Sequence, residues 1–429
     1  MIRPRGALRV FLSRCRSGAA WCASKIGPGV ITGASDDDPS GIATYAIAGA
    51  TAGYSMLWLA LITTPMMIVV QQTCARIALV SGKGLVQAMA TVTPVWLVRT
   101  LILLVVGANT LNVAADIAGM SSSAELVTRL PAGAWAIGFG VLLIGVEVFA
   151  SYRLFASVVK WLCLALLTYV ATAFVVHADW GAAIYHTFVP EIHLERLWLA
   201  TLVGFLGTTI TPYLFVWQAS LEIEERIATT HKATAEPAQV TRDVRASDAD
   251  VTSGMVYSNV VSWFIVLTTA ATLHVHGVSI ATVRDAAEAL RPLAGANAEL
   301  LFALGVLGAG LLAVPVMAGS SAYGIAEAFG WREGLGAAPR SAPAFYAVIT
   351  FGIILGVLAD LLHLDAVWAL FWSAVVNGFV AVPILIAIAI ASNRRKLMGE
   401  WRSGWRSNFW LIATIVLMAL AAVGLVATA

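Results

Sequence analysis

Residues 33–41 read Gly-Ala-Ser-Asp-Asp-Asp-Pro-Ser-Gly, a polar stretch in the middle of an otherwise apolar run from Trp21 to Ala50. Charged groups at bilayer depth are costly and occur almost only where they face a cavity, a partner charge or an ion. Pro39 removes a backbone donor and clashes with the preceding turn. Irregular backbone is tolerated inside a membrane only where it is buried in protein or lines a water-filled cavity. The stretch therefore predicts an interrupted membrane helix whose break borders a polar site.

The composition of the whole chain agrees with a membrane environment. Of 429 residues, 59% are hydrophobic and 12% are charged, and the mean hydropathy is +0.85. A surface facing water could not carry this composition, so we expect an all-α integral membrane protein with the lipid bilayer as its partner. The formal net charge of +2 is close to neutral and does not indicate binding to nucleic acid. No nucleophile–base arrangement and no cofactor fingerprint is present, so we expect no enzyme and no cofactor.

Eleven apolar runs are long enough to cross a bilayer, which takes about 20 residues. The first and the sixth contain polar residues at their centres. The runs cover residues 21–50, 55–80, 95–120, 134–150, 154–176, 198–219, 255–274, 300–323, 344–362, 366–391 and 409–427.

The distribution of positive charge predicts the orientation. With the N-terminus inside, 22 of the 26 Lys and Arg residues fall on the cytoplasmic side, and only Arg129, Arg196, Arg284 and Arg291 fall outside. Cytoplasmic segments carry such an excess, so we expect a cytoplasmic N-terminus and an external C-terminus, in a bacterial inner (plasma) membrane. Residues 1–20 are then a basic cytoplasmic tail. Residues 222–254 are expected to form a solvated cytoplasmic loop, because their charge is mixed.

The sixth run repeats the pattern of the first, with Gly204, Gly207 and Thr208-Thr209-Ile210-Thr211-Pro212-Tyr213. Breaks in the first and sixth helices are typical of inverted repeats that hold a substrate at the bilayer midplane. We therefore expect a LeuT-type fold of five plus five helices, with repeats over residues 21–178 and 197–391 and an extra helix over residues 408–428. Two unrelated proline kinks would leave the acidic cluster unexplained.

The chain resembles the Nramp family of divalent-metal transporters over nearly its whole length. The resemblance is carried by Gly27-Pro28-Gly29, by Asp38-Pro39, by residues 71–82 (QQTCARIALVSG) and by Asp116 in the run AADIAG. It implies a secondary transporter that works by alternating access. The divalent metal ion is then the substrate, held between the two interrupted helices.

The chain departs from the family motifs at residues that matter for chemistry. The family has Asp-Pro-Gly-Asn in helix 1 and Met-Pro-His in helix 6, whereas this chain has Ser40 and Gly41 after Pro39, with Thr211 and Tyr213 flanking Pro212. Gly119 replaces the family's helix 3 Glu. Loss of a soft sulfur ligand removes a filter against hard cations. We therefore expect an oxygen-lined site for a hard ion such as Mg²⁺ or Mn²⁺, and transport that is not strictly proton-coupled. The pattern resembles the magnesium-transporting branch of Nramp relatives or a neighbouring branch whose substrate is uncertain.

Asp38 is the leading candidate ligand, since it matches the family position and precedes the break. Asp116 is a candidate for a proton or water path. Asp36 and Asp37 are weaker candidates, because three consecutive carboxylates cannot all face one ion on a regular helix, and one is expected to face an aqueous vestibule or pair with a basic group. The resemblance and the polar positions together give the candidate metal-site set as Asp38, Ser35, Thr208, Thr211, Tyr213, Asp37 and Asn377.

Each candidate also has a structural alternative. Asp38 could have a purely structural role, accepting hydrogen bonds from backbone donors. The Thr211 hydroxyl could donate to the backbone of its own helix, and Asn377 could be a contact between packed helices. Lys160 could reach the cytoplasmic surface, or it could pair with Asp36 or Asp37 and block the site. Two alternative functions therefore stay open: carriage of an organic cation, or a relative with a closed site that does not transport.

Overall fold

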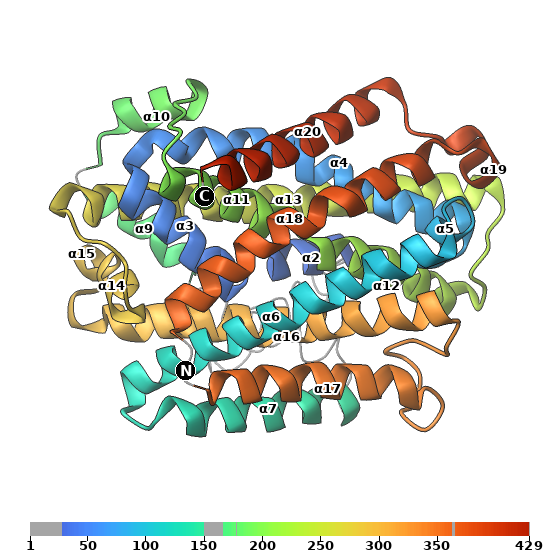
Figure 1. Cartoon of the computed structure of the whole chain (residues 1–429), viewed down its shortest axis with the longest axis horizontal. Helices are drawn as coiled ribbons and strands as arrows, with labels where there is room; N and C mark the ends of the chain where they lie inside the picture. Colours follow the sequence, from blue (N-terminus) through green and yellow to red (C-terminus); the bar gives the residue numbers. More distant parts are fainter. Residues whose placement is uncertain (1–27, 150–165, 177, 363–364, 429) are drawn as a thin grey trace, which may run out of the picture.

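The computed structural model describes residues 28–149, 166–176, 178–362 and 365–428, and these residues form helices and loops without a β-strand (Figure 1). The helices are α2 (Pro28–Asp36), α3 (Pro39–Ala52), α4 (Leu57–Ser81), α5 (Leu85–Ala90), α6 (Val95–Thr128), α7 (Ala132–Phe149), α9 (Leu167–Val175), α10 (Trp180–Phe188), α11 (Arg196–Thr209), α12 (Pro212–Thr230), α13 (Pro237–Thr272), α14 (Val283–Glu288), α15 (Arg291–Ala294), α16 (Ala298–Phe329), α17 (Pro343–Asp360), α18 (Ala366–Asn393), α19 (Arg395–Met398) and α20 (Trp405–Ala427). The predicted helical membrane fold is confirmed.

The described residues contain nine stretches that are long and apolar enough to span a membrane. One of these, Pro39–Ser81, joins two consecutive predicted spans, α3 and α4. Part of the predicted fifth span, residues 154–165, lies outside the described residues. Lys160 is in that part. The number of eleven therefore stays a prediction.

The segment 222–254 differs from its predicted form. α12 continues to Thr230 and α13 begins at Pro237, so only a short connection is not helical. The polar residues lie on these helical extensions, where some of them are buried against other helices, as Glu222 and Arg226 are. Mixed charge indicated exposure to solvent, and this holds for Lys232 and Arg242, but Arg226 is buried and pairs with Asp243 within the protein.

Both polar interruptions separate two helices. α2 ends at Asp36 and α3 begins at Pro39, while α11 ends at Thr209 and α12 begins at Pro212. Proline is well tolerated as the first residue of a helix, because that position has no intrahelical partner for an N–H group. The two prolines thus start the second half of each interrupted helix.

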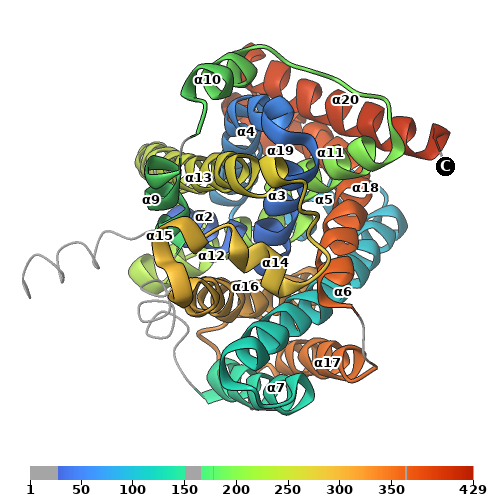
Figure 2. The same cartoon turned by 90° about the vertical axis from the view of Figure 1, so that its left-hand side faces the viewer.

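Close packing between small residues places these halves in the interior. A Cβ atom on Gly33 of α2 would lie 2.3 Å from the backbone of Gly254 in α13. A Cβ atom on Gly207 of α11 would lie 2.4 Å from the backbone nitrogen of Gly378 in α18. Small residues at helix crossings let backbones approach in this way. Figure 2 shows α2 and α3 between an edge formed by α7 with α17 and an opposite edge formed by α4 with α20.

Candidate functional site

Asp38 sits at the N-terminus of α3 and caps it. Its Oδ1 atom accepts hydrogen bonds from the Gly41 backbone N–H at 2.6 Å and from the Ser40 hydroxyl at 2.7 Å. Such a cap satisfies donors that a helix start leaves without partners. One oxygen of the carboxylate is thereby committed to the fold, and Oδ2 is left for other contacts.

Tyr213, from the start of α12, connects the two interrupted helices. Its hydroxyl donates to the Ser35 carbonyl at 3.0 Å and lies 3.4 Å from Asp38 Oδ2. The Thr208 hydroxyl oxygen lies 2.9 Å from where a Cβ atom on Gly41 would be. Asp38, Ser35, Tyr213 and Thr208 therefore gather at one place, which we call the central site.

Several buried polar atoms around the central site have no hydrogen-bond partner. Leaving such groups unpaired inside a protein costs free energy, so a cluster of them is unusual. An ion or ordered water is the kind of partner that satisfies them. The unpartnered atoms belong to Thr208, Thr211, Asn377, Asp36 and Asp37, and all five residues are no more than 2% exposed.

Asp116 and Asn377 enter from neighbouring helices. Ala115, beside Asp116 on α6, packs in one small cluster with Ala43 of α3 and Leu370 of α18. Asn377 lies next to Gly378, which contacts α11 closely. Both residues thus lie on helices that pack against α3 or α11, and their direct contact with a metal ion remains a proposal.

Asp36 and Asp37 face α13. Both are buried, and both contact the Ser258 hydroxyl of α13, at 2.7 Å from Asp36 Oδ2 and 3.0 Å from Asp37 Oδ1. Neither carboxylate is exposed, and neither forms an ion pair with a described Lys or Arg. Whether Lys160 reaches them lies outside the described residues.

Sequence reasoning missed two features of this region. Ser258 lies 222 positions from Asp36 in the chain, and nothing local marks a serine as the partner of a distant carboxylate. Asn109, Asn112 and Asp116 follow one another at spacings of three and four, which places them on one face of α6. That polar stripe on an apolar helix was visible in the sequence and could have been identified.

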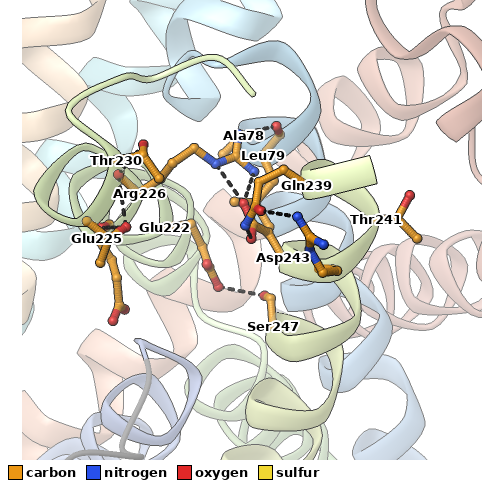
Figure 3. Close-up of polar contacts among 12 residues, drawn as sticks. Ala78, Leu79, Glu222, Glu225, Arg226, Thr230, Gln239, Thr241, Asp243 and Ser247 are labelled. Carbon is orange, nitrogen blue, oxygen red and sulfur yellow. Dashed lines mark hydrogen bonds and ion pairs between the residues drawn. The ribbon is translucent and has the colours of Figure 1, made fainter. Parts of the chain in front are cut away.

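A second polar group, which we call the inner network, joins α2, α12 and α13. The Thr32 hydroxyl contacts Gln218 Oε1 at 2.6 Å, and Gln218 Nε2 donates to Glu222 Oε1 at 2.8 Å. The Ser247 hydroxyl donates to the same Glu222 oxygen at 2.5 Å (Figure 3). A continuous chain of hydrogen bonds thus ties α2 to both of its neighbours.

Arg226 completes the inner network. Its guanidinium pairs with Asp243 at 2.9 Å and donates to the Leu79 carbonyl at 2.6 Å (Figure 3). Nearby, Asp250 accepts from the Gly29 backbone N–H at 2.6 Å. α2 is therefore held at this end of the molecule by backbone and side-chain bonds together.

The chemistry of the central site follows from its donors. Carboxylate, hydroxyl, amide and carbonyl oxygens suit hard divalent ions that keep several waters. In the described part of the chain, no group of three or more His, Cys, Asp or Glu side chains is already arranged to hold a metal ion. A metal ion at the central site would therefore have to use at most two such side chains, with neutral oxygens as its other ligands.

The fold and the two interrupted helices define an integral membrane transporter. Residues 29–428 match the model of the natural resistance-associated macrophage protein-like (Nramp) family. The chain therefore belongs to the Nramp family, as the sequence motifs predicted.

Similar proteins include two bacterial relatives. The chain is 27% identical over 404 residues to the divalent metal cation transporter MntH of Burkholderia ambifaria, covering 92% of this chain and 87% of that one. It is 28% identical to MntH of Deinococcus radiodurans, covering 91% and 87%.

Solved structures show the same fold. A crystal structure of the Eremococcus coleocola manganese transporter matches with a TM-score of 0.75 at 15% identity, covering 93% of this chain and 85% of that one. Mhp1, a nucleobase-cation-symport-1 family transporter, matches with a TM-score of 0.57 at 15% identity, covering 94% and 93%. The second match supports the predicted LeuT-type arrangement.

Proposed function

We propose that this protein carries a divalent metal cation, a hard ion such as Mg²⁺ or Mn²⁺, through the central site by alternating access. The observation that supports this most is the unpartnered set of oxygen atoms beside Asp38, at the point where α2 and α11 end. The curated relatives are divalent metal cation transporters by name. Asp38 Oδ2, the Ser35 carbonyl and the hydroxyls of Thr208, Thr211 and Tyr213 would supply the oxygen ligands.

We also propose that transport is not strictly proton-coupled. Tyr213 stands where the family has a histidine, and a tyrosine relays protons poorly near neutral pH because its ordinary pKa is near 10. A membrane potential of 100 mV favours entry of a dication by about 4.6 kcal/mol, so voltage alone can drive uptake. Asp37 and Asn377 remain candidate ligands, and Asp116 remains a candidate for a proton or water path.

Proteoliposomes that enclose a metal-sensitive dye and a pH-sensitive dye test both parts. We expect saturable Mg²⁺ or Mn²⁺ entry that accelerates when the inside is negative, with little acidification. Liposomes with the Asp38→Asn variant are the control and should behave like protein-free ones. Absence of flux above protein-free liposomes would overturn transport, and a fixed proton-to-metal ratio across voltages would overturn the coupling proposal.

A further inference from the structure

A pocket of about 380 Å³ lies away from the central site and holds three histidines and two glutamates. It is lined by residues 51–55 at the end of α3, by the segment after α10, and by the start of α11 and the end of α13. This is the side that the Lys and Arg distribution predicts to be external. Asp38 starts α3 and the pocket lies at the other end of this helix, roughly 20 Å away for 14 residues.

The segment between α10 and α11 presents its metal-ligand side chains to this pocket. Residues 191–195 read Glu-Ile-His-Leu-Glu and belong to no helix, and the residues at either end of this segment, Val189 and Glu195, have extended backbone angles. Successive side chains alternate in direction along an extended chain. Glu191, His193 and Glu195 accordingly line the pocket, whereas Ile192 and Leu194 face outward and are 63% and 76% exposed.

Two imidazoles bracket one carboxylate in the pocket. His186 Nδ1 lies 3.3 Å from Glu191 Oε2, and His193 Nε2 lies 3.2 Å from Glu191 Oε1. A tetrahedral metal ion with bonds of about 2.1 Å places its nitrogen and oxygen ligands about 3.4 Å apart. The observed separations are close to those of ligands that share one ion. The three side chains are not already arranged round one point, so binding requires the Glu191 and His193 side chains, both 45% exposed, to rotate toward the ion.

The third imidazole is oriented by a backbone group. His274 Nδ1 lies 2.9 Å from the Ala50 carbonyl oxygen. A carbonyl can only accept, so the Nδ1 atom carries the hydrogen and the neutral ring keeps a free lone pair on Nε2. This is the arrangement in which metal-binding histidines are commonly held. Because His274 lines the same pocket, its Nε2 atom can join the ligands there.

The electrostatics of the pocket also favour a cation. Glu191 and Glu195 bring two negative charges, and no Lys or Arg is among the lining residues. α3 ends at Ala52 beside the pocket, and the C-terminal end of a helix carries partial negative charge.

We propose that His186, Glu191 and His193, with His274 and Glu195 near them, form an external capture site for a divalent transition-metal ion such as Zn²⁺ or Co²⁺. Imidazole with carboxylate suits such ions and discriminates against Mg²⁺, which prefers oxygen ligands. Binding at this site stands on its own geometry, whereas its role as the first stop of transported Mn²⁺, the transition-metal ion among the proposed substrates, rests on the proposed function.

Titration calorimetry with Zn²⁺, on full-length detergent-solubilised protein carrying Asp38→Asn, isolates this site from the central one. We expect a Zn²⁺ site whose affinity falls on the order of tenfold or more when His186→Ala or His193→Ala is added. Excess Mg²⁺ should not displace Zn²⁺ from it. His231→Asn is the matched control, because His231 lies outside the pocket and its φ of 59° is one that Asn tolerates.

Unchanged Zn²⁺ affinity in both histidine variants would overturn the site, as would displacement by Mg²⁺. In proteoliposomes with the native Asp38, His193→Ala should raise the KM for Mn²⁺ entry and leave kcat nearly unchanged. An unchanged KM would overturn the capture role. If the native protein shows no metal flux, the proposed function fails, while the calorimetry still decides whether the site binds Zn²⁺.

Discussion

The inner network and the central site share the helices α2 and α12, yet their polar groups are partnered very differently. In the inner network, Glu222 Oε1 accepts two hydrogen bonds and Arg226 has both an ion pair and carbonyl partners (Figure 3). At the central site, Thr208 and Thr211 hydroxyls have none. Polar groups that have all their hydrogen-bond partners stabilise one arrangement of helices. Polar groups without partners can still bind a ligand. The difference indicates which region carries stability and which carries binding.

Replacing Asp38 should have the largest effect on binding. Asp38→Asn removes the charge that faces a metal ion but keeps an oxygen that can cap α3, and Asn is as good a cap as Asp. We expect Mg²⁺ or Mn²⁺ affinity to fall on the order of 100-fold, measured by titration calorimetry, with the melting temperature nearly unchanged.

Asp36→Asn is the matched control for that measurement. Asp36 is equally buried but faces Ser258 rather than Tyr213, so its loss should weaken metal binding far less. Equal losses for the two variants would contradict the assignment of Asp38 as the ligand. A large fall in melting temperature for Asp38→Asn alone would make Asp38 a structural cap instead.

Replacing Arg226 should affect stability rather than binding. Arg226→Ala leaves Asp243 without its ion pair and the Leu79 carbonyl without a donor. Breaking a buried pair costs about 3–5 kcal/mol, and because the Asp243 side chain is 22% exposed we expect a value near the lower end. The melting temperature in detergent should fall clearly, while metal affinity measured well below it stays the same.

Arg242→Ala is the control for Arg226. The Arg242 guanidinium donates to Gln239 on an exposed surface, so its loss should leave the melting temperature nearly unchanged. A weakened metal affinity in Arg226→Ala protein that is still folded would show that the two regions are not separable.

Much of the fold was predictable from local signals. Hydropathy located the helices, and Pro39 and Pro212 located the interruptions, because proline acts on its own turn regardless of distant contacts. The helical form of residues 222–254 was not predicted. A segment of mixed charge indicates a solvated loop unless the partners of its charged residues are known. Here Arg226 on α12 pairs with Asp243 on α13, 17 positions away in the chain.

The central site was predictable only in part. Asp38, Ser35, Thr208 and Tyr213 came from the motif positions, and the structure brings these four together. The position of Asp36 and Asp37 against Ser258 depends on how α13 crosses α2, which is a tertiary property. Sequence gives the type of each donor, but which donors remain unpartnered depends on packing.

Thr211 offers the finest test of the comparison, with the smallest expected effect. Its hydroxyl is buried and unpartnered at the point where α11 gives way to α12, and the family places a methionine there. Thr211→Met adds a soft sulfur donor, so preference should shift from Mg²⁺ toward Mn²⁺ or Cd²⁺ by about tenfold in competition binding. Thr211→Val removes the hydroxyl at nearly the same volume and adds no sulfur, so it should weaken Mg²⁺ slightly without creating a preference for Cd²⁺. If both variants keep the native competition profile, Thr211 does not face the ion.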